Sequence, residues 1–247
     1  MRSLVLGLVT TIAISGVASA ADMANSLDTA LFDWSGWYVG AHIGAGAGNE
    51  DWTLLDNPGD GESGSIGEVV TEHDVNGLLG GVQAGMNWQT GSLVLGGEVE
   101  LALAGIGGDS SRYSDGDKPG PREWSTEMNW LATLGPRLGY AADRILFYVE
   151  GGLAVGGADL YHLGAKGGVP PGTGSEREYF GSDVRFGSFV GAGAEFAFAD
   201  TMSARVEYNF ANFASDEAEL HGEPTDPAVF GIDQTLHVVK VGLNFHF

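Results

Sequence analysis

Apolar and polar residues alternate with a period of two along most of the chain, which is typical of β-strands that have one apolar and one polar face. The segment HVVKVGLNFHF at residues 237–247 shows the pattern clearly, with Val239, Val241 and Leu243 in one set and Lys240 and Asn244 in the other. We delimit eight such runs. They span residues 36–48, 75–89, 92–104, 127–140, 145–159, 183–198, 202–213 and 233–247.

The lengths and connections of these runs predict a membrane barrel. Each run is longer than an ordinary strand and exceeds the ~9–11 residues with which a tilted strand crosses a bilayer. Short turns containing TG, AADR and ADT alternate with long loops. Bacterial outer-membrane barrels place short turns on the periplasmic side and long loops outside. We therefore predict an all-β fold, an eight-stranded antiparallel up-and-down transmembrane β-barrel with short periplasmic turns and four long extracellular loops.

The facing of the runs indicates that the apolar side points outward. In SARVEYNF, Val206 and Tyr208 share one face, and Arg205 and Glu207 share the other. An eight-stranded barrel has an interior just wide enough for side chains, so it cannot hold the many aromatic residues of the apolar set. The apolar set therefore faces lipid and the polar set faces the interior, and the final run closes the barrel against the first.

The N-terminal residues predict export. Arg2 precedes an apolar stretch that ends in Ala18-Ser19-Ala20, as in a signal peptide with its cleavage site. We predict a signal peptide at residues 1–20, a periplasmic N-terminal segment at 21–35 and a barrel domain at 36–247. Cysteine is absent, which excludes disulfides and thiolate metal sites. Glycine is frequent, with 41 residues that fall mostly inside the alternating runs.

Several stretches resemble a known family. They are LGPRLGYAADRILFYVEGGLAVG at 134–156, GAGAEFAFADTMSARVEYNF at 191–210 and the closing VKVGLNFHF. The chain resembles the small porin-like β-barrel surface proteins of alphaproteobacteria, a family that includes major surface antigens and haemin-binding proteins. The resemblance implies the outer membrane of a Gram-negative bacterium. It also implies that Phe245 and Phe247, at the periplasmic interface, form an assembly signal read by the barrel-assembly machinery. Pro136, inside a strand, and the acidic loops depart from the family.

The inward positions carry charges of both signs. An eight-stranded interior leaves little room for water, so we predict that these charges pair as an ion-pair network. Inward glycines such as Gly191 and Gly193 make room for the long side chains. The alternative is a narrow hydrated channel lined by the same residues. The predicted network comprises Glu98, Glu100, Arg137, Glu150, Arg185, Glu195, Arg205, Glu207 and Lys240.

The formal net charge of −22 is concentrated in two predicted loops. Residues 49–74 contain eight acids and no base, and residues 215–232 contain five acids and no base. This surface argues against nucleic-acid binding, which requires Lys and Arg. We expect outer-membrane lipid and lipopolysaccharide as partners of the barrel and a solvated surface at the acidic loops. The alternatives for these loops are divalent cations that bridge the carboxylates to lipopolysaccharide phosphates, and a basic extracellular ligand.

No motif indicates a cofactor or a metal site. The histidines lack zinc-ligand spacing, although loose calcium binding by Asp56, Asp60 and Glu62 stays open. We place His73, His162 and His221 on external loops, and the family resemblance raises haemin binding with one of these three histidines as axial ligand.

The sequence predicts no enzyme. Lipid-modifying barrels need a serine and a histidine at the outer rim, and no spacing singles out Ser110, Ser111 or Ser125 beside His162. We therefore predict a structural and surface-interaction role in the cell envelope. The alternatives are a narrow porin for small solutes and a haemin-binding surface receptor.

Overall fold

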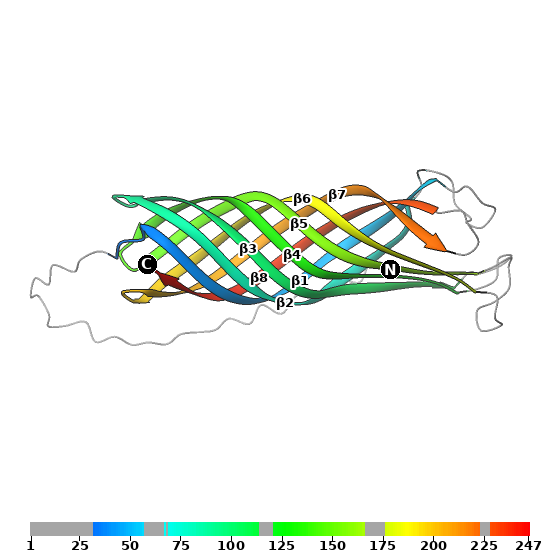
Figure 1. Ribbon diagram of the computed structural model, residues 1–247, viewed down its shortest axis with the longest axis horizontal. Helices are drawn as coiled ribbons and strands as arrows, with labels where there is room; N and C mark the ends of the chain where they lie inside the picture. The colour runs from blue at the N-terminus through cyan, green and yellow to red at the C-terminus, as the bar shows by residue number, and fades with distance from the viewer. Residues whose placement is uncertain (1–31, 57–66, 68, 114–120, 166–175, 223–227) are drawn as a thin grey trace, which may run out of the picture. The chain divides into compact units, whose positions relative to one another are not determined.

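A computed structural model describes residues 32–56, 67, 69–113, 121–165, 176–222 and 228–247. Within these ranges the chain forms a closed barrel in which each strand pairs with its sequence neighbours and the first pairs with the last (Figure 1). All pairs are antiparallel, so the predicted fold class is confirmed. The strands are β1 (Gly36–Asp56), β2 (Val69–Thr90), β3 (Leu93–Tyr113), β4 (Pro121–Ala142), β5 (Ile145–Ala165), β6 (Glu176–Ala199), β7 (Met202–Gly222) and β8 (Ala228–His246).

The strands extend well beyond the predicted runs. The short turns lie where the sequence placed them, and Gly91 and Asp143 adopt left-handed φ angles of 62° and 56° there. At the opposite end, however, β2 begins at Val69 rather than at 75, and β7 continues to Gly222 rather than ending at 213. The predicted loops were therefore too long. Hydrophobic alternation fades where the wall leaves the lipid, while backbone pairing continues.

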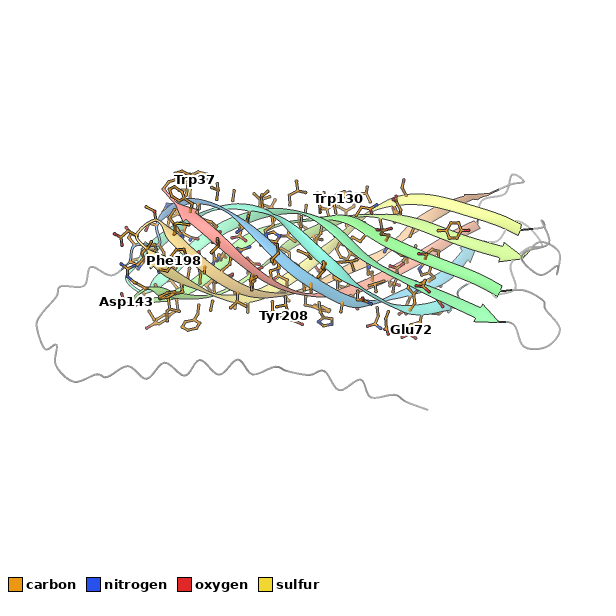
Figure 2. The ribbon with its side chains drawn as sticks, turned by 90° about the horizontal axis from the view of Figure 1, so that it is seen from below. Trp37, Glu72, Trp130, Asp143, Phe198 and Tyr208 are labelled. Carbon is orange, nitrogen blue, oxygen red and sulfur yellow. The ribbon has the colours of Figure 1, made fainter. Side chains whose placement is uncertain are left out.

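The alternation of exposure follows the predicted facing. On β8 Val239 is 53% exposed and its neighbour Lys240 is 4% exposed. Figure 2 shows Trp37 and Phe198 near the end that carries the Asp143 turn, and Glu72 toward the opposite end. Exposed acids follow the apolar band along the strands toward that opposite end. They are Glu72, Asp74, Asp109, Glu127, Asp159 and Asp233. In the described part of the chain, no helix is long and apolar enough to span a membrane.

Pro136 is accommodated by an interruption of one ladder. It faces outward on β4 and stands opposite Gly97 of β3. The β4–β5 register passes from Leu134 directly to Arg137, so neither Gly135 nor Pro136 has a β5 partner. Proline has no N–H to donate, and a skipped pair on this side removes the conflict.

A second interruption separates β6 from β7 in the outer half of the barrel. Their register is lost between the Phe180–His221 pair and the Gly187–Phe213 pair. Residues 181–186 of β6 remain paired with β5 on their other side. This seam leaves residues 181–186 of β6 without strand partners on the side that faces β7.

Candidate functional site in the barrel interior

The inward side chains form layers along the barrel axis. Along β3, starting from the periplasmic turn, they are first Val94, then Glu98 and Glu100, and finally Ala102 and Ile106. The same order of apolar, charged and apolar positions is found on β6, with Ala197, Glu195 and Phe189. A second polar layer follows toward the outside, so the interior has two polar layers, each bordered by apolar packing.

The periplasmic mouth is sealed by residues that precede β1. Phe32 and Trp34 are buried in an apolar cluster that includes Val94 and Leu146. The Trp34 backbone N–H donates to Gln89 Oε1 over 2.8 Å, which fixes the segment against β2. The last residues of the predicted periplasmic segment at 21–35 are therefore part of the barrel closure, whereas residues 1–31, with the predicted signal peptide, lie outside the described part.

Arg205 is central to the inner polar layer. Its Nη1 donates to both oxygens of Glu98, over 2.7 and 2.8 Å, and its Nη2 donates to Glu100. The same guanidinium lies 3.5 Å from Glu207 Oε2. Lys240 bonds Glu100 and lies 2.6 Å from Glu207 Oε1. Five predicted site residues are therefore joined in one connected set.

Arg137 continues this network between two tyrosines. Its Nη2 bonds Glu195 Oε2 over 2.6 Å, and its guanidinium carbon lies 3.5 Å from the centre of the Tyr148 ring. The Tyr38 hydroxyl donates to Glu98 over 2.5 Å, and the Tyr148 hydroxyl donates to Glu207 over 2.6 Å. The charges are thus both paired and hydrogen-bonded, which a buried ion pair needs if it is to offset its desolvation.

Glycines make space for these two rings. A Cβ on Gly85 would lie 2.3 Å from the Tyr38 ring, and one on Gly193 would lie 2.4 Å from the Tyr148 ring. We predicted that inward glycines make room for long charged side chains. At Gly193 the space is instead occupied by the aromatic ring of Tyr148. At Gly191 the nearest atoms belong to Asn209 and Glu150.

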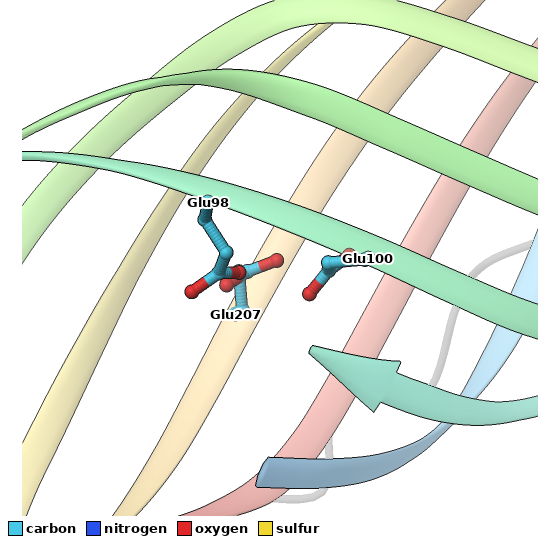
Figure 3. Close-up of side chains that lie close together, drawn as sticks. All are labelled: Glu98, Glu100 and Glu207. Carbon is cyan, nitrogen blue, oxygen red and sulfur yellow. The ribbon is translucent and has the colours of Figure 1, made fainter. Parts of the chain in front are cut away.

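Figure 3 shows three buried carboxylates close together, those of Glu98, Glu100 and Glu207. Carboxylates at this spacing can hold a metal ion, since their ligand oxygens lie within 4.8 Å of one another. Here the positive charges are supplied by the protein itself, because Arg205 contacts all three and Lys240 contacts two of them. The geometry is that of an ion-pair cluster with built-in cations.

Glu150 lies beside this network without joining it. It is the register partner of Arg137, yet no ion pair links the two among the described residues. Its side chain is only half-buried. Of the nine predicted site residues, Glu150 is the carboxylate that the structure leaves without a cation of its own.

An apolar layer fills the barrel above the inner charges. Ile106, Met128, Phe213 and Leu236 are fully buried in it. A cavity of ≈ 20 Å³ separates this layer from Lys240 and is lined also by His42 and Asn209, which is room for about one water molecule. The complete cluster comprises Val75, Leu79, Ala102, Ile106, Met128, Leu131, Ala154, Phe189, Ala211, Phe213, Leu236 and Val238.

Arg185 belongs to the second, outer polar layer. Its Nη1 donates to Glu50 Oε2 and to Gln234 Oε1, each over 3.1 Å. Glu50 also accepts from Thr126 over 2.7 Å. The nine residues predicted as a single network are therefore split, because the apolar layer separates Arg185 from the rest. The sequence analysis also missed Glu50, although steps of two along β1 from Tyr38 reach it.

The histidines lie differently from the expectation. His73 is in β2, is 6% exposed and neighbours Glu50 in the β1–β2 register, so it is not on an external loop. His162 lies in β5 and His221 in β7, because the strands extend into the predicted loops. The suggested calcium ligands Asp60 and Glu62 fall outside the described residues.

One serine, histidine and glutamate meet at the periplasmic end. Ser203 Oγ donates to Glu195 Oε1 over 2.5 Å and lies 2.9 Å from His246 Nε2, which is itself 3.4 Å from Glu195. In a nucleophilic triad the acid holds the other ring nitrogen, so that Nε2 is free for the serine. Here the Ser203 hydroxyl and the Glu195 carboxylate both approach the same ring nitrogen, His246 Nε2. Ser203 is also fully buried. The arrangement supports Glu195 rather than activating a nucleophile.

The two predicted assembly residues end the closing strand. Phe245 and Phe247 are both exposed, and their ring centres lie 5.1 Å apart. The backbone N–H of Phe247 donates to Trp37 O over 2.9 Å, which completes the closure of β8 against β1.

Comparisons with known proteins agree with this architecture. The model of the family described as "Outer membrane protein beta-barrel domain" matches residues 10–247. The 31 kDa outer-membrane immunogenic protein of Brucella melitensis is 31% identical over 92% of this chain and 89% of its own. The 22 kDa outer membrane protein of Rhizobium leguminosarum is 27% identical over 87% and 78% of the two chains. The structure of the outer membrane protease OmpT from Escherichia coli aligns over 86% of this chain and 97% of the OmpT chain, with a TM-score of 0.52. The two sequences are 8% identical, so the likeness is one of fold alone.

Proposed function

Because the chain belongs to the outer membrane protein β-barrel family, we propose that it is a non-conducting barrel that anchors an extended surface outside the membrane and catalyses no reaction. The family places the chain in the outer membrane. The relatives from Brucella and Rhizobium are small outer-membrane proteins of alphaproteobacteria, as the sequence resemblance implied. The observation that carries the proposed role is the apolar layer that crosses the whole interior.

A porin needs a continuous polar path. In this barrel an ion that passed the outer polar layer would meet Ile106, Phe213 and Leu236, none of which offers a hydrogen bond. Transfer of an unpaired charge into such surroundings costs many kcal/mol. Beyond the inner network, Phe32 and Trp34 present a second apolar seal. Two seals in series support closure over the porin alternative.

The outer half of the wall supports a display role. The strands continue past the apolar band, and the described outward side chains there include acids such as Glu72, Glu127 and Asp159. The Brucella relative is called immunogenic, which fits a surface exposed to the exterior. We propose lipopolysaccharide, met through divalent cations, as the neighbour of this acidic wall.

The observations do not favour catalysis or haemin binding. The Ser203, His246 and Glu195 group is sealed behind Phe32 and Trp34, so no substrate reaches it from the periplasm. Of the three histidines considered for haemin, His73 is buried inside the barrel and is not presented to an external porphyrin. His162 and His221 belong to strands β5 and β7 rather than to loops.

Planar-bilayer conductance tests the proposal. We expect refolded wild-type protein, with insertion verified by protease protection, to give no stable current steps. The matched variant carries Phe189→Ala and Phe213→Ala, which hollow the apolar layer, together with Trp34→Ala, which opens the periplasmic seal. Current steps that appear only in this variant would assign the block to the two seals. Stable steps in the wild type would contradict the proposal and favour the narrow porin.

A further inference from the structure

A small cavity lies at the boundary between the inner polar layer and the apolar layer. Its volume is ≈ 20 Å³, and its lining includes His42, Asn209 and Lys240. Glu100, which Figure 3 shows inside the inner layer, lines it as well. His42 is 4% exposed and Asn209 is 5% exposed, so bulk water does not reach either side chain. What the cavity can hold therefore depends on the hydrogen-bonding groups of its own lining.

A chain of hydrogen bonds fixes which ring nitrogen of His42 carries the proton. The Asn244 amide N–H donates to Glu195 Oε1 over 2.7 Å, so the Asn244 oxygen is left to accept. Gln83 Nε2 donates to that oxygen over 2.8 Å, and Gln83 Oε1 therefore accepts from His42 Nδ1 over 2.8 Å. Because the carboxylate at the start of the chain can only accept, both amide orientations and the histidine tautomer follow from it. In the neutral ring, Nδ1 carries the proton and Nε2 carries a lone pair.

Two acceptors and one donor of the lining remain for an occupant. His42 Nε2 lies across the ring from Gln83, which does not line the cavity, and it has no hydrogen-bond partner in the described part of the chain. Asn209 donates from Nδ2 to Glu207 over 2.8 Å, and within the same described ranges its Oδ1 is likewise unpartnered. Lys240 uses two of its three N–H donors on carboxylates. Buried polar groups are rarely left unpaired, because each one loses its bonds to water.

We propose that this cavity is a binding site for a single water molecule. The water oxygen accepts from Lys240 Nζ, and its two hydrogens go to His42 Nε2 and Asn209 Oδ1. Three hydrogen bonds are the usual number for a buried water, and the volume is that of about one molecule. A small cation would lie against the Lys240 ammonium group, and an anion would face two acceptor lone pairs. Water is the small species that can donate to both acceptors and also accept from the lysine.

The water closes a ring of hydrogen bonds around the inner layer. One side of the ring consists of ion pairs that run from Glu195 through the two buried arginines to Lys240. The other side consists of the neutral groups of Asn244, Gln83 and His42. The water joins the two sides at the boundary with the apolar layer. The site depends on these contacts and not on whether the barrel conducts.

Filling the cavity tests the proposal. The test variant carries Ala211→Val, and the matched control carries Ala154→Val. Both alanines belong to the apolar layer, and of the two only Ala211 lines the cavity. Magnetic relaxation dispersion of water deuterons, recorded on the refolded barrel in detergent micelles, counts the long-lived internal water molecules. We expect the control to keep the wild-type count and the test variant to have one water molecule fewer.

The histidine tautomer gives a second readout. In NMR spectra of ¹⁵N-histidine-labelled barrel, the His42 signals are identified by their absence from His42→Gln. We expect the proton on Nδ1 in the wild type, and an Nε2 resonance that moves toward that of a free acceptor in Ala211→Val but not in Ala154→Val.

Other outcomes would overturn the assignment. An unchanged water count in Ala211→Val would show that the cavity holds no water. A proton on His42 Nε2, alone or together with Nδ1, would remove the acceptor on which the site rests. Binding of ¹⁵N-labelled ammonium that Ala211→Val abolishes would assign the cavity to a cation instead. If Ala211→Val fails to fold, Ala102→Val fills the same cavity from β3, and the same loss of one water molecule is expected.

Discussion

Arg205→Met removes the central cation of the inner polar layer while preserving much of the side chain's volume. In the wild type the connected set contains four carboxylates, those of Glu98, Glu100, Glu195 and Glu207, and three cations, those of Arg137, Arg205 and Lys240. The formal charge of this set is therefore −4 + 3 = −1, and it becomes −2 in the variant.

The expected cost follows from what is left unpaired. Glu98 loses both of its short bonds to Arg205 and retains Tyr38 and the more distant Arg137, at 3.7 Å. Breaking a buried pair by removing one partner costs ~3–5 kcal/mol. For an unfolding slope of about 2 kcal/mol per M urea, a loss of about 4 kcal/mol lowers the midpoint by about 2 M.

Urea unfolding of the refolded barrel, followed by tryptophan fluorescence and by heat-modifiable gel mobility, measures this loss. Arg144→Met is the matched control, because its pair with Asp200 lies at the periplasmic turns with the two side chains 41% and 92% exposed. We expect this control to change stability by about 0–1 kcal/mol. Adding Glu98→Gln to Arg205→Met should recover part of the loss, since it removes one uncompensated charge. Equal stabilities of the Arg205 and Arg144 variants would refute the view that the inner network is buried and paired.

Two further predictions concern the ends and the wall of the barrel. Amides of residues 181–186 that face β7 should exchange with solvent much faster than those of residues 187–197, because the seam leaves the former without strand partners. Hydrogen-exchange mass spectrometry measures this difference. Equal protection of the two segments would show that the seam is closed. Deletion of Phe247 should lower the amount of folded barrel in the outer membrane of cells, measured by fractionation, yet leave refolding into detergent largely intact, because its ring is exposed; unchanged cellular yield would remove the assembly role proposed for Phe245 and Phe247.

Hydrophobic alternation was sufficient to predict the number, order and facing of the strands. Each outward residue must suit lipid and each inward one must fit a narrow interior, so the two sets differ strongly in residues such as Val206 and Arg205. The short turns were predictable as well, since they join runs directly. Strand ends on the outer side were not, because a wall that projects into water needs no apolar face.

That loss of signal also concealed the layering of the interior. Glu50 and Ile106 lie just beyond the predicted ends of their runs, so Glu50 was counted with the acidic loop and Ile106 was not assigned to the interior at all. Without these two positions, Arg185 had no partner of its own and the apolar layer was incomplete. The alternation of inward and outward residues continues in steps of two from Tyr38 to Glu50. Extending this period past the lipid band would therefore have located both the partner of Arg185 and the missing part of the apolar layer.

The layered interior also bears on how the strands find their register. Replacing a buried ion network with apolar residues often leaves stability unchanged or raises it, so stability alone does not explain charges inside a closed barrel. A register slip of one residue would turn every inward side chain of a strand toward lipid. For β7 that would place Arg205 in the apolar band. The cost of an exposed arginine there is ~2–4 kcal/mol at the midplane and falls toward the interface. A barrel filled only with residues like Phe213 and Leu236 would resist such a slip much less. We infer that the charges specify facing and register, while the apolar layer closes the path through the barrel.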